Sequence, residues 1–149
     1  MQKSFLFGWL ILPPFYAILV FIQSDKPELE RGNSMKKIWV QMIDNSISKK
    51  WWNQIISHFI EVGDTFEIRC WKEEIAEITQ ASLYGVATDD DYEVSVKGVI
   101  TKKLIEELLT EEPTDKSIYN KMTKYFTVNV KNDLCDISSA HYGTELYIG

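Results

Sequence analysis

Four side chains in this chain are of the types that attack substrates or bind transition metals: two histidines and two cysteines. They are His58, His141, Cys70 and Cys135, and no two of them have the short paired spacing of a zinc site. Cys135 precedes His141 by six residues, but the turn-rich stretch between them offers no geometry that would activate a thiol. The sequence therefore predicts no metal site and no cofactor.

Motifs for other common chemistries are also missing from the sequence. It contains no GxxxxGK[ST] phosphate loop, no GxGxxG dinucleotide motif and no GxSxG nucleophile elbow. Each of these motifs depends on glycines that let the backbone approach a phosphate or expose a nucleophile. We therefore expect a noncatalytic protein with no catalytic residues.

Carboxylates form the densest cluster of functional groups. Asp89, Asp90 and Asp91 are consecutive, and Glu93 follows them. A calcium loop needs spaced ligands and a glycine, and this stretch lacks both. A second acidic run, residues 106–112, is typical of a solvated helix face. Because both runs would complement lysines and arginines on a partner, we predict that Asp89, Asp90, Asp91 and Glu93 bind a partner.

The polar sides of two expected strands supply the other candidate binding residues. In residues 37–43 and 65–71, apolar side chains alternate with larger or polar ones. If the apolar side of each strand faces helices, then Trp39, Arg69 and Trp71 point the opposite way. Tryptophan and arginine are enriched in binding hot spots, so these three residues join the predicted partner-binding set. The alternative is that the C-terminal tail or residues 1–34 cover this face and make a second small core.

Hydrophobic periodicity predicts the elements that position these residues. Strands are expected at 37–43, 65–71, 92–100 and 126–130, with one or two more in 136–149. Helices are expected at 48–60, 73–84, 101–112 and 114–125, and Thr101 can cap the third of them.

The predicted order from Met35 is β-α-β-α-β-α-α-β-β, with no interior linker, which indicates a single globular domain over residues 35–149. Fully buried parallel strands would be apolar throughout, whereas these strands have one polar side. We therefore expect an α+β (or α/β) fold of two layers, with helices packed on one face of a four- or five-stranded sheet.

Residues 1–34 contain an apolar run, 5–22, followed by a polar linker. The run is just long enough for a membrane-spanning helix, but Pro13 and Pro14 lie at its middle. It also lacks a convincing signal-peptide cleavage site. A third interpretation is that Glu30-Arg31-Gly32 reflects a purine-rich ribosome-binding sequence, so that translation starts at Met35. The protein is then cytoplasmic, whereas a retained 5–22 segment would anchor it to a membrane.

The charge of the chain bears on its partners. The formal net charge is −6, and it lies entirely after residue 34, because residues 1–34 contain three basic and three acidic residues. A negative surface disfavours nonspecific binding to nucleic acid, which requires basic side chains, and it favours basic partners. We therefore expect a basic protein partner and no nucleic acid.

Two segments, "FEIRCWKEE" (66–74) and "SSAHYGTELYIG" (138–149), resemble small uncharacterised bacterial proteins of the toxin-immunity type. The resemblance implies a cytoplasmic protein that blocks a toxin domain, and it assigns no functional residue. Together with the charge, it predicts a noncatalytic acidic binding protein that neutralises a basic toxin domain. A membrane-anchored accessory module and an unrecognised enzyme remain as alternatives.

Overall fold

The computed structural model describes residues 5–12, 16–24, 36–42, 49–113 and 121–149, with side chains from Lys49 onward except that of Trp51. Within these ranges the chain forms nine strands and three helices. The strands are β1 (Phe5–Leu12), β2 (Tyr16–Ser24), β3 (Lys36–Met42), β4 (Thr65–Trp71), β5 (Gly85–Asp89), β6 (Glu93–Val99), β7 (Thr127–Lys131), β8 (Asp136–Ala140) and β9 (Glu145–Ile148). The helices are α1 (Lys50–Phe59), α2 (Ile75–Ala81) and α3 (Lys102–Thr110).

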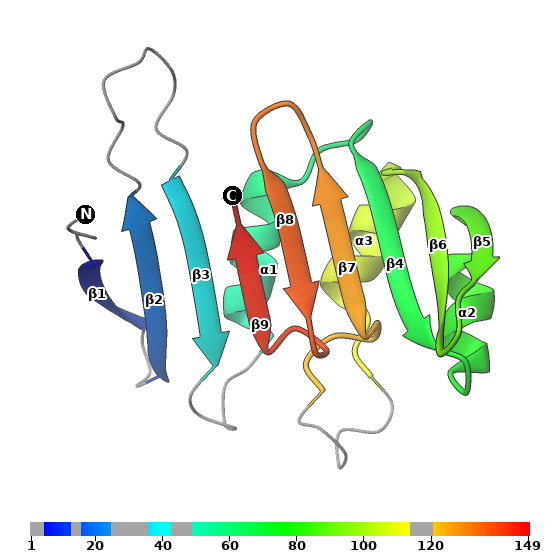
Figure 1. Cartoon of the computed structure of the whole chain (residues 1–149), viewed down its shortest axis with the longest axis horizontal. Coiled ribbons are helices and arrows are strands. Elements are labelled where there is room, and N and C mark those ends of the chain that lie inside the picture. The colour runs from blue at the N-terminus through cyan, green and yellow to red at the C-terminus, as the bar shows by residue number, and fades with distance from the viewer. Residues whose placement is uncertain (1–4, 13–15, 25–35, 43–48, 114–120) are drawn as a thin grey trace.

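The nine strands form one sheet in the order β1-β2-β3-β9-β8-β7-β4-β6-β5. Every neighbouring pair is antiparallel, so the fold is α+β rather than α/β. The three helices lie behind the sheet, on one of its faces (Figure 1). The prediction of helices on one face is confirmed. The predicted count of four or five strands and the predicted element order are wrong.

Strand β5 accounts for part of the difference in order. The sequence predicts no strand between the end of the second helix and the acidic residues, yet Gly85–Asp89 pairs with β6. Because β5 is an edge strand and four of its five residues are exposed, it lacks the alternation by which half-buried strands are recognised. The acidic stretch consequently begins at the end of a strand instead of in a long loop.

The helix expected at 114–125 accounts for another part of the difference between the predicted and the observed element order. Residues 114–120 lie outside the described residues, and residues 121–125 are not helical. There the backbone N–H groups of Met122 and Thr123 both donate to the Tyr142 carbonyl, each at 3.0 Å. These N–H groups therefore bond to the β8–β9 turn, a segment distant in sequence, instead of to carbonyls of a helix.

The apolar run at 5–22 falls in β1 and β2, which pair with each other, and β2 pairs with β3. Pro13 and Pro14 lie outside the described residues. Nowhere in the described ranges is there a helix with the length and hydrophobicity needed to cross a membrane. The start at Met35 stays a prediction.

The core lies between the helices and the sheet, as the strand alternation predicts. On β4 the side chains of Phe66, Ile68 and Cys70 are buried against the helices, while Glu67 and Arg69 lie on the other side, half-buried. The helices contribute buried apolar residues to the same cluster, including Trp52, Ile56, Ala81, Leu104 and Leu108. Burial of this apolar surface is the main favourable contribution to folding.

Helix α3 is held at both ends by side chains. The Thr101 hydroxyl accepts a hydrogen bond from the Leu104 N–H at 3.2 Å, which confirms the predicted N-cap. At the other end, Lys49 Nζ donates to the carbonyls of Leu108 at 2.6 Å and Glu111 at 2.5 Å. These carbonyls have no intrahelical partner, so a lysine placed before α1 satisfies them.

Candidate partner-binding face

The face of the sheet opposite the helices, which we call the open face, carries the polar residues of the alternating strands. Residues directly opposite one another in an antiparallel pair lie on the same face. The strand register places Glu67 opposite both Lys97 and Asn129, and continues the row through Ser138 and Tyr147. Five strands, β6, β4, β7, β8 and β9, thus contribute to one row of side chains.

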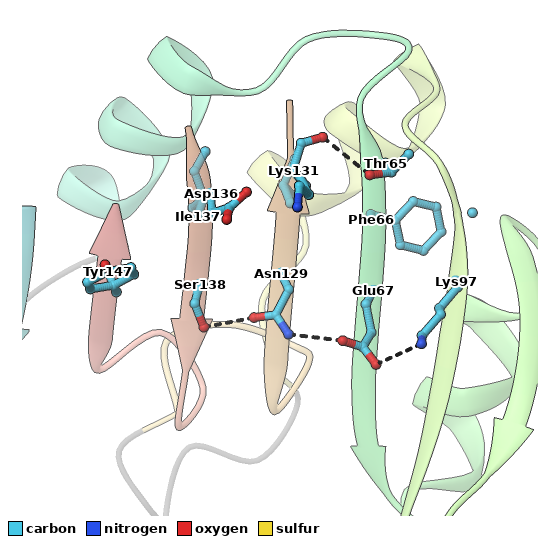
Figure 2. Close-up of a pocket in the computed structure, with 12 residues that line it drawn as sticks. Thr65, Phe66, Glu67, Lys97, Asn129, Lys131, Asp136, Ile137, Ser138 and Tyr147 are labelled. Atoms are coloured by element: carbon cyan, nitrogen blue, oxygen red, sulfur yellow. Dashed lines mark hydrogen bonds and ion pairs between the residues drawn. The ribbon is translucent and has the colours of Figure 1, made fainter. Parts of the chain in front are cut away.

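Four of these five side chains are joined in a line across the strands (Figure 2). The Ser138 hydroxyl donates to Asn129 Oδ1 at 2.7 Å, and Asn129 Nδ2 donates to Glu67 Oε2 at 3.2 Å. The other carboxylate oxygen of Glu67 accepts from the Ser95 hydroxyl at 2.6 Å, and Lys97 Nζ lies 3.8 Å from it. Glu67 is therefore fixed in place from both neighbouring strands, β6 and β7.

The surroundings of Glu67 determine its charge. Its partial burial acts to raise the pKa of the carboxyl group. Hydrogen bonds from Ser95 and Asn129, together with the nearby charges of Lys97 and Arg69, outweigh this effect, so the net pKa is lowered from 4.5. Glu67 is consequently ionised at neutral pH and is poorly suited to accept a proton as a general base.

A groove of about 570 Å³ lies along this row on the open face. One wall is the row already described, and the other is a second row formed by Thr65, Lys131 and Asp136 (Figure 2). The groove is lined by Thr65, Phe66, Glu67, Lys97, Gly98, Asn129, Val130, Lys131, Asp136, Ile137, Ser138 and Tyr147. Its volume falls within the range of pockets that bind small molecules.

The residues predicted to bind a partner meet farther along β4, beyond the groove. Arg69 Nη2 lies 2.5 Å from Glu93 Oε2 and 3.7 Å from Asp90 Oδ2. Asp90 Oδ1 also accepts the Asp91 N–H at 2.8 Å, while Asp89 is exposed at the end of β5. The structure thus brings Arg69 together with two of the four predicted carboxylates.

The two predicted tryptophans lie apart. Trp71 is 36 % exposed on β4, two residues after Arg69, and its ring centroid is 4.7 Å from that of Phe126. Trp39 is on β3, and three strands separate β3 from β4 in the sheet. In the register Trp39 is opposite Tyr147. Trp71 is therefore near the acidic residues, and Trp39 is not.

The cysteines lie in environments that suppress their reactivity. Cys70 is buried in the core, and its burial is the main reason that its pKa is raised to about 12. Burial also raises the pKa of the half-buried Cys135. Both thiols are therefore protonated at neutral pH, and a protonated thiol is a weak nucleophile. In the described part of the chain, no three or more His, Cys, Asp or Glu side chains are grouped so that they could hold a metal ion.

Sequence reasoning missed several residues of the groove: Asn129, Ser138, Lys131, Asp136 and Tyr147. All except Lys131, which directly follows the predicted strand at 126–130, lie on the polar side of a strand that the sequence predicts. The alternation therefore already indicates that these residues share a face with Glu67. Their register is set by strand pairing between distant segments, and that pairing is not visible in the local pattern.

Comparisons with protein-family models, with curated proteins and with solved structures each found no match to this chain.

Proposed function

We propose that this chain is a noncatalytic binding protein whose open face binds a basic protein partner. Within that class, the immunity type fits best: a protein that neutralises a basic toxin domain by covering its surface. The observation that carries the proposal is the placement of an exposed tryptophan, Trp71, beside the Arg69–Glu93–Asp90 cluster at one end of the open face.

This arrangement has the composition of a binding hot spot. Tryptophan and arginine contribute most to binding energy when a partner excludes water from them. Arg69 carries one positive charge and is paired with two carboxylates, those of Glu93 and Asp90, so the cluster keeps an excess of negative charge. Asp89 and Asp91, both exposed, add to this excess. A basic partner would therefore meet an aromatic contact and uncompensated carboxylates together.

The charge of the whole chain supports the same partner. A net charge of −6 creates a long-range field that accelerates encounter with a basic protein. Such steering depends on ionic strength, because salt screens charges farther apart than about 10 Å at 0.1 M. Association with the partner should consequently slow as salt is added.

The test is a binding measurement by biolayer interferometry between the full chain and each protein encoded beside its gene. The variant Asp89→Lys/Asp90→Lys/Asp91→Lys should weaken binding to the basic partner by at least about tenfold. The matched control is Glu61→Lys/Glu106→Lys/Asp133→Lys, which changes net charge equally at exposed sites outside this cluster.

The control variant should retain most of the affinity, and Trp71→Ala should lose affinity without a change in salt dependence. Equal losses in the two triple variants would mean that net charge alone attracts the partner, and the proposed binding face would be wrong. Absence of binding to every neighbouring gene product would contradict the immunity function itself. Circular dichroism verifies that each variant is folded.

A further inference from the structure

Strand β5 is an uncovered edge of the sheet (Figure 1). It pairs with β6 on one side, and no described strand pairs with its other side. Four of its five residues are exposed, so the described part of the chain does not cover it. Sheets protect such edges with proline, lysine, a bulge or a covering segment. Residues 85–89 contain no proline or lysine, and their register with β6 is unbroken.

The register shows which backbone groups of this edge are free. The Asp90 N–H donates to the Glu93 carbonyl at 2.9 Å, so these residues form a hydrogen-bonded pair. In an antiparallel ladder such pairs alternate with pairs whose N–H and C=O groups point away from the partner strand. Along β5, the residues whose backbone groups point outward are Gly85, Ala87 and Asp89. The edge therefore offers three donors and three acceptors to an added strand.

Apolar side chains lie exposed around the same edge. Val86 is 74 % exposed, and its register partner Lys97 places it in the row of Glu67 on the open face. Leu83 lies two residues before β5 and is 70 % exposed, and Tyr92, in the β5–β6 turn, is 77 % exposed. An added strand would cover Val86, its neighbour across the edge, and bury apolar surface while its backbone bonds to β5.

The charge of this edge is not balanced locally. Residues 83–92 contain three aspartates and no lysine or arginine. The cations on strands β4 and β6 each already have a carboxylate, because Arg69 lies 2.5 Å from Glu93 and Lys97 lies 3.8 Å from Glu67. The three aspartates therefore remain as an excess of negative charge, which lysines or arginines of an added segment would offset.

The edge is continuous with the face proposed to bind the partner. Thr88 on β5 is opposite Ser95, and Ser95 is opposite Arg69. Only β6 separates β5 from β4, and neighbouring strands are about 4.8 Å apart. The free edge is therefore roughly 10 Å from the strand that carries Arg69 and Trp71, so one partner can contact both.

We propose that β5 pairs with an extended, lysine- or arginine-containing segment of the basic partner, which adds a strand to the sheet. Backbone hydrogen bonds would hold the segment, and the aspartates would select its charge. A second copy of this chain fits the edge less well, because it would bring another acidic stretch and another net charge of −6. The proposal rests on the proposed function, since it specifies how the partner attaches beside the Arg69 cluster.

The experiment uses the ¹⁵N-labelled full chain and the peptide acetyl-Lys-Val-Lys-Val-Lys-Val-Lys-amide. This Lys-Val peptide should shift the amide resonances of Ala87 and Asp89. A Lys-Pro peptide, with proline in place of each valine, has the same charge but lacks alternate N–H groups, so it should bind at least about tenfold more weakly. A Glu-Val peptide, with glutamate in place of each lysine, should leave the β5 resonances unchanged.

A variant of the chain tests the outward N–H directly. Ala87→Pro removes this N–H but leaves the bonds of β5 to β6, because an edge strand tolerates proline where the N–H faces solvent. It should weaken binding of the Lys-Val peptide by about tenfold. Ala87→Val adds similar bulk and keeps the N–H, so it should bind the peptide at least about fivefold more tightly than Ala87→Pro.

Thermal unfolding followed by circular dichroism verifies that these variants are folded. Thr88→Pro, which removes an N–H that bonds to β6, should melt at a lower temperature than Ala87→Pro. If Ala87→Pro does not fold, the comparison of the Lys-Val and Lys-Pro peptides on the wild type still tests the backbone pairing.

Three results would overturn the proposal. They are equal binding of the Lys-Val and Lys-Pro peptides, equal binding of the Lys-Val peptide by the two Ala87 variants, and resonance shifts on the open face without shifts in β5. A wild-type dimer that Ala87→Pro converts to a monomer in analytical ultracentrifugation would also contradict it, because the edge would then pair with a second copy.

The two proposals fail in different ways. If the Lys-Val peptide binds at β5 but no neighbouring gene product binds the chain, the proposed function fails and the edge assignment stands. If a basic partner binds, depends on Asp89, Asp90 and Asp91, and binds Ala87→Pro as it binds the wild type, the edge assignment fails alone.

Discussion

Tyr125 and Glu107 are paired in the interior, where the tyrosine hydroxyl donates a hydrogen bond to Glu107 Oε1. The exposed fractions of the two residues are 1 % and 6 %. Gln80 Nε2 donates to the other carboxylate oxygen at 2.9 Å, and Lys124 Nζ lies 3.6 Å from Oε1. The expectation that Glu107 belongs to a solvated helix face is therefore wrong. A buried carboxylate with this many partners links α3 to α2 and to the segment before β7.

The Glu107 pair predicts a loss of stability in acid. Burial acts to raise the pKa of Glu107, but hydrogen bonds from Tyr125, Tyr84 and Gln80 and the charge of Lys124 lower it below 4.5 overall. A lowered pKa in the folded state stabilises the protein above the unfolded value, and this contribution disappears as pH falls through the folded pKa. Urea unfolding should therefore show a free energy of unfolding that falls as the pH drops below 4.5.

In Glu107→Gln this acid-dependent loss should be smaller, and stability at neutral pH should drop by about 1–3 kcal/mol because a charge-assisted hydrogen bond is removed. Glu106→Gln, at the adjacent exposed position, should retain the wild-type pH dependence. An equal acid-dependent loss in the wild type and Glu107→Gln would show that other carboxylates control the transition.

Lys49 provides a second prediction. Replacing it with methionine keeps the aliphatic stem but removes both hydrogen bonds to the carbonyls at the end of α3. Lys49→Met should destabilise the protein by about 1–3 kcal/mol. Lys50→Met, at the exposed neighbouring position, should change stability by no more than about 0.5 kcal/mol. Thermal and urea unfolding of the two variants give the comparison, and similar losses in both would refute the capping role.

Gly143 and Gly63 form a matched pair for a third prediction. Both have positive φ, 86° and 101°, so alanine is strained at either position. A Cβ at Gly63 would meet nothing within 4 Å, but at Gly143 it would lie 2.7 Å from Thr123 Cγ2. Gly63→Ala should cost about 1–2 kcal/mol from the backbone alone.

Gly143→Ala should cost about 1–3 kcal/mol more than Gly63→Ala, because the Thr123 side chain must also move. Differential scanning calorimetry of the two variants measures this difference. Equal losses would mean that the turn adjusts to admit a methyl group and that only the backbone conformation matters.

The cysteines give a fourth prediction. Since Cys70 is buried with a pKa raised to about 12, it should resist iodoacetamide in the native protein at neutral pH. Mass spectrometry should find any slow labelling at Cys135 alone, and both thiols should react in urea. In Cys135→Ser the native protein should remain unlabelled. Rapid native labelling of Cys70 would show that this part of the core opens easily.

Local patterns predicted the elements that have one buried and one polar side. The alternation at residues 65–71 gives β4 with its observed boundaries, and Thr101 caps α3 as expected. They failed where a neighbour distant in sequence decides the structure. Glu107 is buried because Tyr125 reaches it from 18 residues away, and segment 121–125 is not helical because Tyr142 accepts its backbone hydrogen bonds.

The same distinction applies to the candidate site. Arg69, Glu93 and Trp71 could be found from the sequence because residue type alone marks them as candidates. The groove could not be found, because it depends on the pairing of β7, β8 and β4, which places Ser138 and Asn129 beside Glu67. Serine and asparagine are not marked as binding candidates by residue type, so they are recognised only when the strand register is known.

The position of β9 has a consequence for synthesis. This strand follows every other strand in the chain, yet it lies inside the sheet, between β3 and β8. On the ribosome, β3 emerges about a hundred residues before its partner Glu145–Ile148, as the register of Ile38 with Ile148 shows. Until then one edge of β3 is paired with β2, and the other edge has no native partner. The nascent chain must therefore keep β3 from pairing elsewhere until translation has passed residue 148, which makes the last strand the one that closes the sheet.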